Sequence, residues 1–212
     1  AETPEQGLVY DAKNLAFILP AGKYIGNSRY KDVFAASAMA DLTSFRNHWG
    51  AETSLDVELY RPVARYELVA KDVATFLNKL STGGLKGESF TARVKYSDYL
   101  PTGYNLWDDV PKNSLMYMEY KVAFERPADG TKELKLGFDY VLTDAGETVS
   151  IPVELEILNE KNEVLARTAF RIPCERGKNT TVRGNFLTSD ANGGIGIDPD
   201  YDGDLEVDLG EL

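Results

Sequence analysis

The chain has 212 residues, 34 of them acidic and 23 basic, so its formal charge is −11. This charge argues against a nucleic-acid partner, because phosphate recognition needs a basic surface. No run of about 18 apolar residues is present, so no membrane-spanning segment is expected. The single cysteine, Cys174, excludes an internal disulfide and a multi-cysteine metal cluster. Twelve tyrosines and a hydrophobic fraction of 43% favour a β-rich domain with a substantial core.

The first 60 residues give mixed signals. Apolar side chains recur at roughly helical spacing within residues 27–42, which predicts one short helix. From Ser54 the apolar period changes to two, and two strands are expected on either side of Arg61-Pro62. Because proline cannot donate to a strand ladder, we place a domain boundary here. The expected units are a partial N-terminal domain, 1–61, and a C-terminal domain, 62–212.

The rest of the chain predicts one helix and then strands. The segment 72–80 has apolar residues at helical spacing, a candidate N-cap at Asp72 and a stop signal at Gly83-Gly84. Asn159 to Asn162 form the clearest hairpin loop. Strands of nine to thirteen residues separated by short polar turns indicate a mostly β protein built as an antiparallel sandwich. The expected strands are 89–97, 115–125, 132–143, 148–160, 163–173 and 180–188.

Catalytic motifs are missing from the sequence. His48 is the only histidine, and its neighbours indicate a loop far in sequence from Cys174. No HExxH, GxSxG, P-loop or strand-linked GxGxxG pattern occurs. We therefore expect no catalytic residues, no cofactor and no enzymatic activity.

The acidic tail permits two interpretations. Asp198, Asp200, Asp202 and Asp204, with Gly203, match the first half of an EF-hand calcium loop. However, Leu209 stands where the bidentate glutamate should be, and the next residues alternate with strand period. We favour an acidic turn that leads into a terminal strand, with calcium binding as the alternative.

An aromatic-rich segment, 95–111, carries Tyr99, Tyr104 and Trp107 among prolines and glycines. These rings could form a platform on which a sugar or peptide stacks. The alternative, which we favour, is a long loop held over the end of the sandwich by its own aromatic side chains.

Four phrases in order, "LYRPVARYELVA", "VKYSDYLPTGYNLWDDVP", "LGFDYVLT" and "TTVRGNFLTSDANGGIGIDPDYDGD", resemble the fimbrillin-like surface lipoproteins of the type V pilus superfamily. The resemblance covers roughly residues 55–205. It implies tandem transthyretin-like sandwiches with Greek-key topology, and residues 59–70 as the crossing between them. It also implies a location at the cell surface, either anchored to the outer membrane or fimbrial.

The resemblance further implies assembly with other pilus subunits, or with copies of itself, by strand exchange. In such proteins a protease removes the first strand, and a C-terminal strand of a neighbour fills the groove. Here the donor would be the strand Asp204 to Leu209, with Leu205, Val207 and Leu209 entering pockets. Two features depart from the pattern: the acylated cysteine is absent, and about 60 residues are too few for a complete first sandwich. The rival expectation is an adhesin that binds a surface glycan or peptide.

Overall fold

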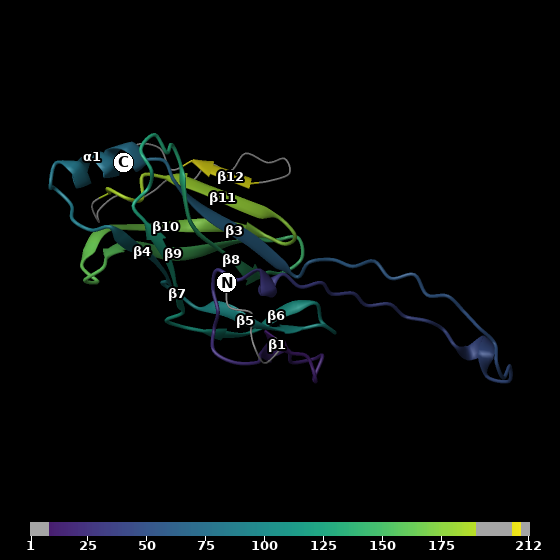
Figure 1. Cartoon of the computed structure of the whole chain (residues 1–212). Coiled ribbons are helices and arrows are strands. Elements are labelled where there is room, and N and C mark those ends of the chain that lie inside the picture. The colour runs from purple at the N-terminus through teal and green to yellow at the C-terminus, as the bar shows by residue number, and fades with distance from the viewer. Residues whose placement is uncertain (1–8, 190–204, 209–212) are drawn as a thin grey trace.

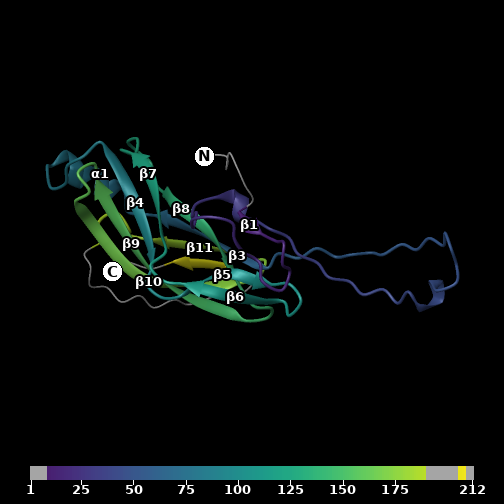
Figure 2. The same cartoon turned by 90° about the horizontal axis from the view of Figure 1, so that it is seen from below.

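The structure, a computed structural model, describes residues 9–189 and 205–208. Two four-stranded sheets stack face to face, and one helix lies beyond their end (Figures 1 and 2). The strands are β1 (Tyr10–Asp11), β2 (Leu19–Pro20), β3 (Val63–Ala70), β4 (Ser89–Tyr96), β5 (Leu100–Asn105), β6 (Val110–Leu115), β7 (Glu119–Glu125), β8 (Leu134–Leu142), β9 (Thr148–Asn159), β10 (Val164–Glu175), β11 (Asn179–Gly184) and β12 (Leu205–Asp208); the helix is α1 (Val73–Ser81), and 3-10 turns cover Arg29–Lys31 and Thr43–Phe45.

The two sheets differ in strand direction. One sheet has the order β10-β9-β4-β7 and is antiparallel throughout. The other has the order β12-β11-β3-β8, in which β3 and β8 are antiparallel while β11 runs parallel to both β3 and β12. The expected mostly β sandwich is confirmed, although one sheet is mixed rather than purely antiparallel.

Alternation along the strands explains the core. Tyr66 and Leu68 of β3 and Ala92 and Val94 of β4 are buried, and their sequence neighbours are less so. Inward-facing side chains of both sheets form one continuous core, as the period of two requires. Cys174 lies in this core, where burial, and then the charge of Asp139, raise the pKa of its thiol to about 12.

The predicted helix 72–80 is confirmed as α1. Phe76 packs edge-on against Phe90 with ring centroids 5.1 Å apart, which fixes the helix on the end of the core. Gly83 has a φ of 76°, the left-handed conformation that ends helices. Asp72 occupies the N-cap position as predicted, but its carboxylate makes no capping hydrogen bond and instead accepts hydrogen bonds from the backbone N–H groups of Leu187 and Thr188. The predicted hairpin at Asn159 to Asn162 is confirmed between β9 and β10.

The helix expected within residues 27–42 is wrong. Only the turn Arg29–Lys31 forms there, and the strand expected before Tyr60 is reduced to one bridge between Ala35 and Tyr60. Residues 36–59, which we call the arm, instead extend away from the sandwich in both views (Figures 1 and 2). Met39 and Trp49 are almost fully exposed, so the apolar face of a helix would find no surface to bury it.

The long loop expected at 95–111 is also wrong, because most of it is the antiparallel hairpin β5–β6. Three expected strands are shorter than the sequence pattern suggested. β7 begins at Glu119 rather than at 115, β8 begins at Leu134 rather than at 132, and β11 ends at Gly184 rather than at 188.

The N-terminal segment packs on the sandwich before the arm begins. Tyr10, Ile18 and Val33 contact a small cluster that contains Tyr104 and Leu142. The division of the chain into domains at residue 61 stays a prediction. In the described ranges, 9–189 and 205–208, no helix has the length and apolar character needed to cross a membrane.

Candidate functional site

The edge strands β7 and β8 lie on the same side of the sandwich. Residues 22–31 fill the space between these two strands. We call this segment the N-terminal cover. The side-chain oxygen of Asn27 accepts a hydrogen bond of 3.1 Å from the backbone N–H of Phe138 on β8. Gly26 lies against the ring of Tyr120 on β7, so closely that a Cβ atom would come within 2.3 Å of it. The cover therefore provides a hydrogen-bond acceptor for an edge strand and covers the core at this side. Its own backbone forms no strand.

A polar cluster is buried beneath the cover. Asp139 of β8 has no exposed surface, and its Oδ1 atom lies 2.7 Å from Nζ of Lys31. Tyr96 donates a hydrogen bond of 2.7 Å to Oδ2, and Tyr24 donates to the same oxygen. Tyr66 is bonded in turn to Tyr96. Burial, and then the negative charge of Asp139, hold the pKa of Tyr24 and of Tyr96 well above the usual value, so both hydroxyls remain donors.

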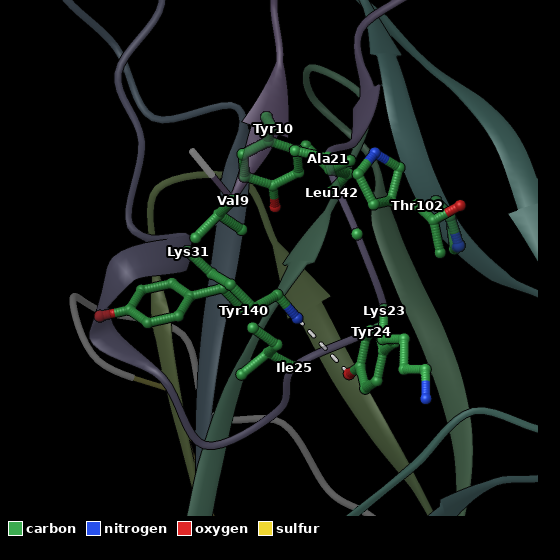
Figure 3. A pocket seen from close by; sticks show the side chains of 13 residues that line it. Val9, Tyr10, Ala21, Lys23, Tyr24, Ile25, Lys31, Thr102, Tyr140 and Leu142 are labelled. Carbon is green, nitrogen blue, oxygen red and sulfur yellow. Dashed lines mark hydrogen bonds between the residues drawn. The ribbon is translucent and has the colours of Figure 1, made fainter. Parts of the chain in front are cut away.

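A cavity of about 210 Å³ lies between the cover, β5 and β8 (Figure 3). Lys31 and Tyr24 point toward each other at one side of it, with Nζ 3.4 Å from the tyrosine oxygen. The same ammonium group stands 4.5 Å from the centre of the Tyr24 ring. Lys31 is thus already held by a carboxylate, a hydroxyl and an aromatic face. The cavity is also lined by Val9, Tyr10, Lys23, Ile25, Pro101, Thr102, Tyr140 and Leu142, among others.

At the opposite edge of the mixed sheet, β12 lies outside β11. Four residue pairs join the two strands in parallel, from Thr180 opposite Leu205 to Arg183 opposite Asp208. Of the expected donor residues, Leu205 and Val207 lie on this strand, whereas Leu209 lies outside the described residues. The tail strand therefore sits at an edge of its own sandwich.

The aromatic residues expected to form a platform are divided by β5. Tyr99 precedes the strand and is 61% exposed, and Trp107 follows it and is 73% exposed. Six residues of strand separate them by about 20 Å. Tyr104, by contrast, is 3% exposed, so its ring faces protein. The structure does not bring these three residues together on one surface.

Tyr104 belongs to a network that the sequence analysis missed. Its hydroxyl and that of Tyr60 both donate to Oδ1 of Asp109, and Arg176 forms an ion pair of 2.8 Å with Oδ2. Burial raises the pKa of Asp109, but the hydrogen bonds from Tyr104, Tyr60 and Arg176 outweigh it and lower that pKa. The network ties the end of the arm to β5 and to the turn before β11. Tyr104 and Asp109 are five residues apart, but Tyr60 and Arg176 are too distant from them in sequence for the four residues to form a motif.

The candidate calcium ligands Asp198, Asp200, Asp202 and Asp204 lie outside the described residues, and calcium binding stays a prediction. Elsewhere, within the two ranges that the structure describes, no group of three His, Cys, Asp or Glu side chains is placed to hold a metal ion. His48 lies on the arm, whereas Cys174 is buried in the core.

Comparison with known proteins gives a family without an assigned activity. The model described as "Family of unknown function (DUF6562)" matches residues 1–210. The comparison with curated proteins found no match to the chain. One solved structure, of a Bacteroides ovatus protein whose description proposes a role in cell adhesion, is 14% identical with a TM-score of 0.33. The match covers 59% of this chain and 41% of that protein, so the chain spans about two fifths of its length.

Proposed function

This chain belongs to the family DUF6562, and we propose from the geometry of its sheet edges that it is a cell-surface structural protein that assembles by β-strand addition. It would act as a fimbrillin-like subunit, or as an anchor or tip relative, either in a fimbria or anchored to the outer membrane. The partners would be further copies or related subunits. The resemblance of residues 55–205 to fimbrillin-like proteins supports the same conclusion.

The observation that carries the proposal is the position of β12. This strand is the outermost of its sheet, and four residue pairs join it to β11. Main-chain hydrogen bonds do not depend on which molecule supplies the strand, so the same pairs can form between two copies. Fifteen residues, 190–204, connect Ser189 to Leu205. A connection of this length is long enough for the tail to pair with β11 of its own chain or of another copy.

The N-terminal cover supplies the second half of the proposal. Arg29 is exposed in the turn at the end of the cover, where a trypsin-like protease could reach it. Cleavage after Arg29 would release Tyr24, Gly26 and Asn27, and would leave the backbone N–H of Phe138 without its acceptor. An open edge of this kind recruits a strand from another chain.

The test uses the full-length precursor, treated with a trypsin-like protease and run on an SDS gel without boiling. A ladder is expected from the intact protein and from a variant in which Tyr99 and Trp107 are replaced by alanine. The ladder should disappear when residues 204–212 are deleted, and also when Arg29→Gln prevents the cleavage after residue 29 that would release Tyr24, Gly26 and Asn27. A ladder that survives deletion of the tail would reject the donor role of Leu205, Val207 and Leu209.

A second candidate function is an adhesin that binds a glycan or peptide through the exposed rings of Tyr99 and Trp107. Exposed aromatic rings of this size can stack on the face of a sugar or pack against a peptide. Binding to a glycan array that is lost in Trp107→Ala, but kept in a variant that cannot form ladders, would favour this function.

A further inference from the structure

Lys31 and Asp139 form an ion pair inside the sandwich. The side chain of Lys31 is 8% exposed and that of Asp139 is fully buried. The distance from Nζ to Oδ1 is 2.7 Å, and the two residues are 108 positions apart in sequence. Withdrawing two charges from water is costly, and a salt bridge in such a place often adds little net stability.

The two carboxylate oxygens of Asp139 have different partners. Oδ1 faces the ammonium group of Lys31 and also accepts the backbone N–H of Tyr140. Oδ2 accepts the hydroxyls of Tyr24 and Tyr96, the second at 2.7 Å. One oxygen is thus placed to receive protons from the lysine, and the other is held by two neutral donors.

We propose that Lys31 and Asp139 condense into an isopeptide bond. One proton first passes from the ammonium group of Lys31 to Oδ1 of Asp139, and the neutral Nζ then forms a bond to Cγ. The bond from Cγ to Oδ1 breaks, and Oδ1 leaves as water with a second proton from the nitrogen. Oδ2 becomes the oxygen of the new amide and keeps its hydrogen bonds from Tyr24 and Tyr96, which also stabilise the negative charge that develops on it during attack. No oxidant or further reactant is needed.

Burial favours this reaction for two reasons. The ion pair disappears and a neutral amide with satisfied hydrogen bonds replaces it. The two side chains are almost fully buried, so water has little access to the new bond and its hydrolysis is slow. Holding the two groups in contact also removes the entropic cost of bringing them together.

The bond would join the end of the N-terminal cover to β8. It closes a loop of more than a hundred residues and so restricts the unfolded chain as a disulfide would. Lys31 follows Arg29, so cleavage after Arg29 leaves the bond in place. The inference is therefore independent of the assembly proposed above, and either can fail without the other.

The mass of the intact, denatured full-length chain tests the inference. We expect a mass lower than that of the sequence by one water, and a digest in which one branched peptide contains both Lys31 and Asp139. A mass equal to that of the sequence would overturn the inference.

Matched variants locate the loss of water. Lys31→Arg keeps a positive charge beside Asp139 and should restore the full sequence mass, whereas Lys23→Arg, at an exposed position of the same cavity, should keep the loss. Tyr96→Phe retains both reacting groups and should give a mixture of the two masses, because one donor to Oδ2 is removed. A loss of water that persists in Lys31→Arg would place the modification elsewhere and overturn the inference.

Discussion

At the scale of single residues, Glu156 shows how a buried charge is compensated. Its carboxylate is fully buried on β9 and is bound by Arg93 and Lys95 of β4 and by Arg167 of β10. Burial raises the pKa of Glu156, but the hydrogen bonds from Lys95, Arg93 and Arg167 outweigh it and lower the pKa from 4.5 to about 2. The folded state therefore stabilises the ionised form.

This lowered pKa predicts an acid-sensitive contribution to stability. Because the pKa of Glu156 is lower in the folded state than in the unfolded state, its contribution to stability is complete above about pH 4.5. This contribution is lost as the pH falls toward 2. Glu156→Gln should cost about 2 kcal/mol at pH 7, a value reduced by solvent screening of the partly exposed cations. The free energy of unfolding in urea should differ less between pH 7 and pH 3 in this variant than in the wild type. The control variant Glu147→Gln, at an exposed position, should show the same difference between the two pH values as the wild type.

Gly103 allows two strands of the hairpin region to approach closely. A Cβ atom there would lie 2.7 Å from the carbonyl oxygen of Ile18 and 2.8 Å from that of Lys112. Both neighbours are backbone atoms, which cannot move aside as a flexible side chain can. We expect Gly103→Ala to cost about 1–3 kcal/mol in thermal or urea unfolding. Gly22→Ala, where nothing lies within 4 Å, should change stability little, and an equal loss in both variants would contradict this account.

At the scale of elements, α1 is fixed through Asp72. The carboxylate joins the start of the helix to the turn after β11 through the N–H groups of Leu187 and Thr188. Asp72→Ala should cost about 2–3 kcal/mol, because the buried N–H of Leu187 loses its acceptor. Urea unfolding measures the loss, and Thr75→Ala, on the exposed face of α1, should lie within about 0.5 kcal/mol of the wild type.

The strands that the sequence predicts best are those with one buried face. β4, β9 and β10 alternate buried and less buried residues over most of their length, and their extents agree with the expected ranges within two residues at each end. α1 was predictable for the same reason, with a period of 3.6 instead of two. The hairpin β5–β6 lacks this alternation of buried and exposed residues, because Leu100–Asn105 is buried on both faces and Val110–Leu115 on neither.

The candidate sites were less predictable than the fold. The tail strand was expected from its alternation, but its parallel pairing with β11 depends on the arrangement of the whole sheet. The partnership of Lys31 with Asp139 left no trace in sequence spacing, since 108 positions separate them. The N-terminal cover has no periodic pattern, because it fills a gap between strands rather than pairing along one.

At the scale of the whole molecule, the arm contributes little to the fold. Its ends meet at Ala35 and Tyr60, which exchange two backbone hydrogen bonds of 2.9 Å. Replacing residues 36–59 by Asn-Gly should therefore give a folded chain with a melting temperature equal to or slightly above that of the wild type, because a two-residue hairpin closes the same pair. A large fall in the melting temperature would show that the arm packs on the sandwich.

The arm should also be the first site of proteolysis. Arg46 is exposed near its tip, and mild trypsin treatment should cut there before it cuts the sandwich. The two fragments should remain associated in gel filtration, because residues 9–35 stay packed on β5 and β8. Arg46→Gln should delay this first cleavage, and an unchanged pattern would place the first cut elsewhere.

Cys174 gives the protein its own reporter of opening. It is the single thiol of the chain, it lies wholly inside the core, and its raised pKa keeps it in the unreactive thiol form. An alkylating reagent can therefore modify it only during excursions in which the two sheets separate. The ratio of labelling rates in native and denaturing buffer then measures how often the sandwich opens, without any engineered probe. Comparing free chains with assembled ones would show whether a strand supplied by a neighbour slows these excursions.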